Sequence, residues 1–124
     1  MAGERILIVE DNPMSMELIH DLLEVHRYTI LQAWDAAKGI EVARTERPDL
    51  ILMDIQLPGM DGLTATRVLK RDARTLDIPV VALTAYAMKG DEVKALEAGC
   101  AGYIPKPIDT REFVGTVQSY LPGS

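Results

Sequence analysis

Short apolar runs alternate with longer helical patterns along this sequence, and that alternation limits the fold more than any other feature. Helical spacing of apolar residues predicts helices over residues 13–25, 35–46, 63–71, 88–98 and from 109 or 110 to 120. Continuous apolar strands joined by helices are typical of a parallel sheet that is covered on both faces. The expected fold is therefore α/β, a (βα)₅ doubly wound sheet, whose strands are predicted at Arg5–Val9, Tyr28–Ala33, Leu50–Met53, Pro79–Leu83 and Gly102–Pro105.

Local signals set the expected helix starts. Asn12 is a good N-cap and Pro13 suits the first helical position. Asp35 is expected to cap the second helix, and Asp109 or Thr110 the last one. The pairs Pro-Gly and Asp-Gly within residues 56–62 predict a loop there.

Length and charge narrow the class of protein. The chain has 124 residues, a net charge of −6 and a pI near 4.8. This length suits one domain, residues 1–124, with no room for an output domain, and the acid excess argues against a nucleic-acid surface. The single cysteine, Cys100, fits a reducing compartment. No signal peptide and no apolar run long enough for a bilayer span are present, so we expect a cytoplasmic protein without a membrane contact.

Polar residues follow four of the predicted strands. Glu10 and Asp11 come after the first strand, Asp54 after the third, Thr84 after the fourth and Lys106 after the fifth. In an open parallel sheet, the functional crevice lies beyond the carboxyl ends of the strands. We therefore expect three carboxylates, one hydroxyl and one ammonium group to meet at one edge of the sheet.

This residue set predicts a site for a cation and a phosphoryl group. Three neighbouring carboxylates repel one another, and a hard divalent cation such as Mg²⁺, or Mn²⁺ in its place, relieves that repulsion. A carboxylate can also attack phosphorus and form an aspartyl phosphate. The alternative is that each carboxylate is only a helix cap or a turn residue, but their joint arrival at one edge favours the functional interpretation.

Four stretches resemble the receiver domain of two-component response regulators, the CheY-like family: Ile6–Pro13, Leu50–Gly62, Val80–Ala85 and Tyr103–Pro107. They span the chain at the family's spacing. The sequence around Asp54 and in Ala85–Glu92 is most similar to DivK-type single-domain regulators, and it is also similar to receivers of hybrid histidine kinases. The resemblance implies a flavodoxin-like sheet with the strand order 2-1-3-4-5.

The resemblance also implies a role for each site residue. Asp54 would accept a phosphoryl group from a histidine kinase or a histidine phosphotransfer protein. Asp11, Asp54 and the backbone carbonyl of Gln56 would bind Mg²⁺, with Glu10 acting through water. Thr84 and Lys106 would bind the phosphoryl oxygens, and the peptide bond from Lys106 to Pro107 would be cis.

A conformational switch is implied by the same family. Phosphorylation would draw Thr84 inward, and Tyr103 would rotate toward the vacated space, although simple packing is the alternative role for Tyr103. The readout would be a population shift of the surface around residues 88–97. Gln56 and Tyr86 occupy positions that vary in the family and flank the line of water attack, so we expect slow self-dephosphorylation.

The first predicted helix offers a docking surface. Its apolar face is expected to carry Leu18, Ile19, Leu22 and Leu23, with Met14 on the shoulder of that face. Together with Pro13 and Pro107, Met14 would form an apolar ring around Asp54 for a kinase helix bundle. Partial burial of Met14 at the edge of the core is the alternative.

Competing functions fit the sequence less well. A Mg²⁺-dependent phosphohydrolase usually needs a second acid two residues after its nucleophile, where this chain has Gln56. A flavin-binding module would need a hydroxyl- and glycine-rich loop after the first strand, where Glu10 and Asp11 would repel phosphate. A pseudo-receiver that only binds would not need the complete acceptor set. We therefore expect a monomeric phospho-accepting switch, not an enzyme, which signals to a downstream protein target.

Overall fold

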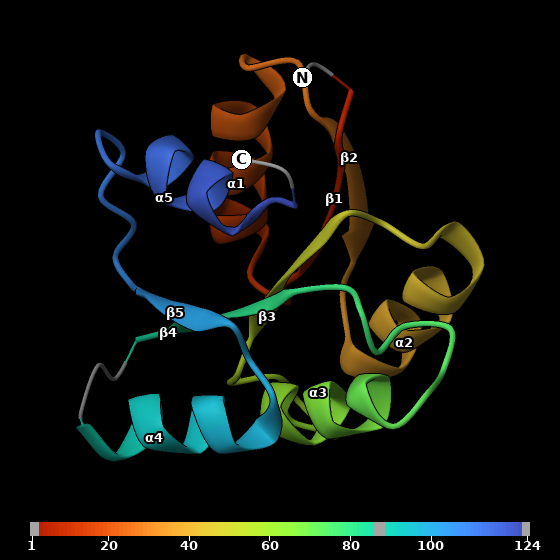
Figure 1. Ribbon diagram of the computed structural model, residues 1–124. Coiled ribbons are helices and arrows are strands. Elements are labelled where there is room, and N and C mark those ends of the chain that lie inside the picture. The colour runs from red at the N-terminus through yellow and green to blue at the C-terminus, as the bar shows by residue number, and fades with distance from the viewer. Residues whose placement is uncertain (1–2, 86–88, 123–124) are drawn as a thin grey trace.

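Five parallel strands form a single sheet in the order β2-β1-β3-β4-β5 (Figure 1). The computed structural model describes residues 3–85 and 89–122. This order and the strand–helix alternation confirm the expected flavodoxin-like fold. The strands are β1 Arg5–Val9, β2 Thr29–Ala33, β3 Leu50–Asp54, β4 Val80–Thr84 and β5 Gly102–Pro105; the helices are α1 Pro13–Glu24, α2 Ala36–Glu46, α3 Gly62–Lys70, α4 Lys89–Ala98 and α5 Phe113–Tyr120.

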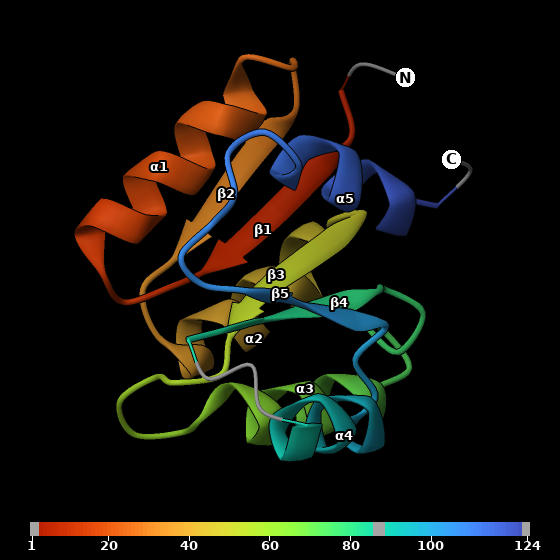
Figure 2. The same ribbon diagram turned by 90° about the vertical axis from the view of Figure 1, so that its left-hand side faces the viewer.

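Two apolar cores lie on the two faces of the sheet. One core packs α2, α3 and α4 against the sheet, and the other packs α1 and α5 against the opposite face. Figures 1 and 2 show these two helical layers with the sheet between them. Every residue of β3 and β4 is buried, whereas the edge strand β2 is partly exposed. The continuous apolar runs in the sequence reflect this burial on both faces.

The first two helices begin where the sequence predicts. The Asn12 side chain accepts hydrogen bonds from the backbone N–H groups of Met14 and Ser15, and Pro13 follows at the first helical position. Asp35 caps α2 by accepting a hydrogen bond from the backbone N–H of Lys38. These contacts satisfy amide groups that have no partner within a helix.

The exposed face of α1 differs from the prediction. The buried side chains are Met16, Ile19 and Leu23, whereas Leu18 is 40% exposed. Leu22 packs only at the margin of the core. Leu18 precedes Ile19 by one residue and so points about 100° away from it, which leaves Leu18 beside the solvent.

The starts of α3 and α5 also differ from the prediction. Asp61 caps α3, so Gly62 is the first residue of that helix and not the end of a loop. Helix α5 begins only at Phe113, after a turn in which the Asp109 side chain accepts a hydrogen bond from the backbone N–H of Arg111. The polar side chain of Asp109 therefore stabilises this turn and does not cap α5.

The strand register aligns the carboxyl ends of the central strands. Val9 pairs with Met53, and Asp54 pairs with Leu83. Because the strands are parallel, the residues that follow them emerge at one edge of the sheet. Every helix within residues 3–85 and 89–122 falls short of the length and hydropathy that a bilayer span requires.

Candidate functional site

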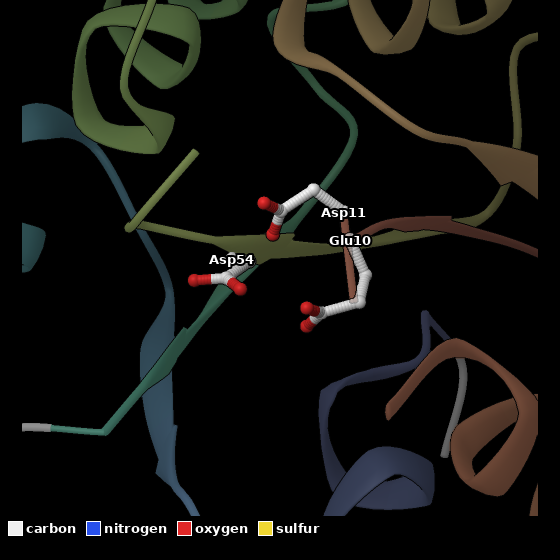
Figure 3. Close-up of side chains that lie close together, drawn as sticks. All are labelled: Glu10, Asp11 and Asp54. Atoms are coloured by element: carbon white, nitrogen blue, oxygen red, sulfur yellow. The ribbon is translucent and has the colours of Figure 1, made fainter. Parts of the chain in front are cut away.

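Three carboxylates lie together at this edge of the sheet. Oxygen atoms of Glu10, Asp11 and Asp54 all lie within 4.8 Å of one another. Figure 3 shows the three side chains extending from the ends of β1 and β3 toward a common space. The Asp11 side chain is exposed, whereas Glu10 and Asp54 are buried. The site is therefore an acidic cluster in which two carboxylates are buried and one is open to solvent.

Lys106 connects the two buried carboxylates. Its Nζ atom donates hydrogen bonds to Glu10 Oε2 at 2.6 Å and to Asp54 Oδ2 at 2.9 Å. The other oxygen of Glu10 accepts a bond from the backbone N–H of Asn12, and the other oxygen of Asp54 accepts one from that of Gln56. Each buried carboxylate thus has one oxygen on a backbone amide and one on the ammonium group.

Burial and neighbouring charges shift the pKa values of Glu10 and Lys106. Burial raises the pKa of Glu10, and the neighbouring Asp54 raises it further, although the hydrogen bond from Lys106 works against both. Burial disfavours the charged form of Lys106, but hydrogen bonds to Glu10 and Asp54 outweigh burial and raise its pKa. Lys106 is therefore a charged ammonium at neutral pH, as the sequence interpretation requires.

The charge balance of the site favours a divalent cation. One ammonium group faces three carboxylates, so negative charge remains uncompensated at the open side, where Asp11 lies. All of these donors are oxygens, which are the ligands that Mg²⁺ prefers. Glu10, Asp11 and Asp54 can therefore hold a metal ion together.

Thr84 and Tyr103 lie next to this cluster in the sheet. Thr84 is the last residue of β4 and is buried, and its carbonyl oxygen accepts a hydrogen bond from the backbone N–H of Lys106 at 2.7 Å. Tyr103 pairs with Ala82, two residues before Thr84. Side chains two residues apart on a strand share a face, so Thr84 and Tyr103 lie on the same face of the sheet. Tyr103 is half-buried and packs against the apolar core on this face.

The remaining predicted residues lie around the site. Gln56 is exposed in the loop after β3, and Pro13 and Pro107 are also exposed. Met14 is 81% exposed, which excludes its partial burial at the edge of the core. The predicted cis peptide bond between Lys106 and Pro107 is present. Tyr86 lies outside the described residues, as does the first residue of the predicted 88–98 helix.

Gly62 is a residue of the site that the sequence pattern did not predict. A Cβ atom on Gly62 would lie 2.2 Å from the carbonyl oxygen of Asp54, which is far closer than atoms can approach. Only glycine therefore lets α3 start directly against the backbone of the site. The signal was the Asp-Gly pair, but the sequence did not show that Asp61 caps a helix whose first residue touches Asp54.

Comparisons with known proteins agree with this geometry. The sequence pattern of the response regulator receiver domain matches residues 6–118. The chain is 47% identical over 116 residues to the polar-differentiation response regulator DivK of Brucella anthropi and to that of Brucella melitensis, covering 94% of each chain. This likeness confirms the resemblance to DivK-type regulators.

Solved structures show the same fold. The receiver domain of a sensor histidine kinase from Pseudomonas aeruginosa, with a magnesium ion coordinated in its active-site cleft, is 36% identical and has a TM-score of 0.88; the match covers 96% of this chain and 98% of that one. The chemotaxis protein CheY4 of Vibrio cholerae is 22% identical with a TM-score of 0.91, covering 97% of this chain and all of that one, and supports the fold alone. With an acidic cluster at the expected edge of the sheet and a match over most of its length, this chain belongs to the response regulator receiver domain family.

Proposed function

We propose that this chain is a phosphorylation-controlled switch in which Asp54 accepts a phosphoryl group. The observation that carries the proposal is the position of the Asp54 carboxylate between an acidic cluster and the Lys106 ammonium group. In that position, the Asp54 carboxylate can bind a metal cation on one side. On its other side, the Lys106 ammonium group is available to pair with a phosphoryl group. The donor would be a phosphohistidine on a sensor histidine kinase or on a histidine phosphotransfer protein.

The transfer is a single exchange at phosphorus. A carboxylate oxygen of Asp54 attacks the phosphorus atom, the phosphorus–nitrogen bond to the donor imidazole breaks, and its electron pair returns to that nitrogen. Asp11, Asp54 and the carbonyl of Gln56 would hold Mg²⁺, with Glu10 contacting it through water. When bound, the metal supplies neutralisation of the charge on the transferring group.

Lys106 and Thr84 act on the product. Lys106 already lies 2.9 Å from Asp54 Oδ2, so a small movement brings its ammonium group onto a phosphoryl oxygen. The Thr84 hydroxyl donates to another phosphoryl oxygen and leaves space on the face of the sheet that it shares with Tyr103. Rotation of Tyr103 into that space changes the surface formed by β5 and its neighbours, which a downstream protein target reads.

Two groups of residues tune this cycle in our proposal. Gln56 and Tyr86 shield the acyl phosphate from water and prolong its lifetime, so Tyr86→Ala should shorten that lifetime, and an unchanged lifetime would refute the idea. Exposed Pro13, Met14 and Pro107 form the docking rim for the helix bundle of the kinase. Met14→Glu should slow transfer from the cognate kinase, and unaltered transfer would remove Met14 from the rim.

We further propose the setting in which the switch works. Residues 1–124 act as one receiver unit, as a monomer in the cytoplasm, and signal through contacts with other proteins. In this proposal, the chain takes part in its own phosphorylation and dephosphorylation and catalyses no other reaction. Sustained turnover of phosphomonoesters would instead indicate a phosphohydrolase.

Intact-mass measurement tests the proposal. The chain is incubated with acetyl phosphate or phosphoramidate and Mg²⁺, and one phosphoryl adduct is expected. Asp54→Asn should abolish the adduct, whereas Asp77→Asn, which neutralises an exposed carboxylate at the far end of the sheet, should retain it. An adduct that persists in Asp54→Asn, or no adduct and no Mg²⁺ affinity in the unaltered chain, would refute the proposal.

A further inference from the structure

Arginines gather at the edge of the sheet opposite the acidic site. Helices α2 and α3 lie side by side on one face of the sheet and both end at this edge (Figure 1). We call this surface the arginine end; its members are Arg44 and Arg47 at the end of α2, Arg67 and Arg71 at the end of α3, and Arg74 in the loop that follows.

Asp72 holds two of these side chains in place. Its Oδ2 atom accepts hydrogen bonds from Arg44 Nε at 2.8 Å and Arg74 Nη2 at 2.9 Å, and its Oδ1 atom accepts one from Arg74 Nε at 3.1 Å. The hydrogen bonds from Arg74 keep the pKa of Asp72 below its usual range, so the carboxylate stays charged. One carboxylate thus positions two guanidinium groups, each of which has further N–H donors for a ligand.

Arg67 and Arg71 extend this surface along α3. The buried face of α3 carries Ala65, Thr66 and Leu69, so Arg67 and Arg71 project from the opposite side and are exposed. They are four residues apart and therefore neighbours on the helix surface. Favourable interaction with the helix dipoles accounts for a cation at the end of each helix, but not for the concentration of arginines from two helices and a loop.

An exposed apolar side chain lies within the same surface. Leu76 is 45% exposed, and its backbone N–H donates a hydrogen bond to the carbonyl of Asp72 at 2.9 Å. The Lys70 Nζ atom donates to the carbonyl oxygens of Leu76 and Ile78, which fixes the loop against α3. Leu76 is therefore presented on an anchored loop beside the pair of arginines that Asp72 holds.

We propose that the arginine end binds a segment of another protein in which carboxylate side chains flank an apolar one. Guanidinium groups match carboxylates in a bidentate manner, and Leu76 provides the apolar contact. Arginine enrichment around an apolar centre is typical of protein–protein interfaces.

The charge of the whole chain favours a short acidic segment over a long polyanion. Residues 44–47 and 67–77 carry six basic side chains and three acidic ones, Glu46, Asp72 and Asp77, so their net charge is +3. Because the whole chain has a net charge of −6, the rest of the molecule carries −9. Nucleic acid or an anionic membrane would extend beyond the arginine end and meet those acidic surfaces. A short protein segment fits within the patch and avoids them.

This surface and the acidic site can be occupied at the same time. The carboxylates lie at the carboxyl ends of β1 and β3, whereas α2 and α3 run back and end at the other edge of the sheet (Figures 1 and 2). A partner held at the arginine end would therefore leave Asp54 open. The proposal does not depend on phosphoryl acceptance. If the arginine end binds no acidic segment, the proposed role of Asp54 is unaffected.

Fluorescence anisotropy tests the proposal with a defined probe. A fluorescein-labelled peptide of repeated Glu-Glu-Leu-Glu-Glu is titrated with the full chain at low and at physiological salt. We expect saturable binding that weakens with salt, because exposed charges are screened over about 8 Å at physiological ionic strength. Arg67→Glu/Arg71→Glu should weaken binding at least about tenfold, and the neutral pair Arg67→Gln/Arg71→Gln should weaken it less.

Matched variants separate this surface from net charge. Lys94→Glu/Arg111→Glu makes the same change of charge at exposed positions on other surfaces and should keep the affinity within about twofold of the unaltered chain. Leu76→Ala should weaken binding about threefold to tenfold through loss of apolar contact. Acetyl phosphate should still phosphorylate every variant, which verifies folding and an intact Asp54 site.

Four results would overturn the proposal. The first is the absence of saturable peptide binding. The second is a loss of affinity in Lys94→Glu/Arg111→Glu as large as that in Arg67→Glu/Arg71→Glu. The third is equal binding of a control peptide with glutamine in place of glutamate. The fourth is tighter binding of a DNA duplex or of phosphatidylglycerol vesicles than of the acidic peptide.

Discussion

Replacing Lys106 with methionine tests the electrostatic account of the site most directly. The ammonium group bonds to Glu10 at 2.6 Å and to Asp54 at 2.9 Å, and the three side chains are 18%, 1% and 6% exposed. Methionine keeps much of the length of the side chain and removes the charge. Two buried carboxylates would then face each other and Asp11 without a cation.

The expected loss of stability follows from this burial. Removal of one partner from a fully buried ion pair costs about 3–5 kcal/mol, because the other charge stays buried and unpaired. Lys106 is partly accessible to water, so we expect Lys106→Met to lower the free energy of unfolding by about 2–3 kcal/mol in the absence of divalent cations. With a urea dependence of about 1–3 kcal/mol per molar, the midpoint should fall by about 1–2 M.

Magnesium should reverse most of this loss. Excess ligand stabilises each folded chain according to its own dissociation constant, so a metal that binds Lys106→Met about 100-fold more tightly than the unaltered chain narrows the difference by about 2.7 kcal/mol. The metal binds Lys106→Met more tightly than the unaltered chain because the ammonium group no longer competes for the same oxygens. The assay is urea unfolding followed by circular dichroism, once with EDTA and once with excess Mg²⁺.

The comparison between the two conditions decides the outcome. The difference between Lys106→Met and the unaltered chain should be large with EDTA and small with Mg²⁺. Lys94→Met removes an exposed lysine of α4 and should change neither curve. If Lys106→Met lost the same stability in both conditions, or none, the carboxylates would not form the shared cation site described above.

Three further predictions concern protonation, packing and thiol reactivity. Burial raises the pKa of Glu10 above that of an ordinary glutamate, so on acidification its protonation should weaken Mg²⁺ binding before an ordinary carboxylate titrates. Calorimetric titrations should show this, and Glu10→Gln should remove that pH dependence. Gly62→Ala should lower the free energy of unfolding by about 2–3 kcal/mol because its Cβ would meet a carbonyl oxygen, whereas Gly115→Ala, in open space, should raise it by up to about 1 kcal/mol; equal shifts in urea midpoints would contradict this. Burial raises the pKa of the Cys100 thiol and hides it from reagents, so a disulfide reagent should label the folded chain much more slowly than the unfolded chain. Equal labelling rates would disprove this.

The meeting of the three carboxylates was predictable from the sequence because parallel strands bring their carboxyl ends to one edge. Glu10, Asp11 and Asp54 follow buried apolar runs, so their convergence needs only the direction of the strands. The order of the strands, in contrast, came from resemblance to a family. Strand periodicity alone does not distinguish one right-handed parallel arrangement from another.

Features that depend on contacts between distant elements were not predictable from local pattern. Gly62 looked like part of a turn because its close contact is with the carbonyl of Asp54, which tertiary packing brings near. The sequence placed Lys106 at the edge of the sheet but did not show that it bonds to both Glu10 and Asp54. Those two contacts span 96 and 52 residues of chain, beyond the reach of helix or strand periodicity.

The same limit applies to α1. Apolar spacing at positions 18, 19, 22 and 23 is compatible with more than one orientation of the helix about its axis. Packing against the sheet selected the orientation that buries Met16 and leaves Leu18 exposed. The exposed Met14 and Leu18 are then four residues apart on the open surface of the helix, which is where a docking partner could reach them.

The register between β1 and β3 also determines when the acidic cluster can form during folding. No hairpin joins these strands, because α1, β2 and α2 lie between them in the chain. A slip of one residue would turn the side chains of β3 to the opposite faces and move Asp54 away from Asp11. The carboxylates therefore come together only after this long loop has closed in the correct register. A cation that the three carboxylates bind together would stabilise the finished centre of the sheet, but it would have no assembled site while the central strands are still apart.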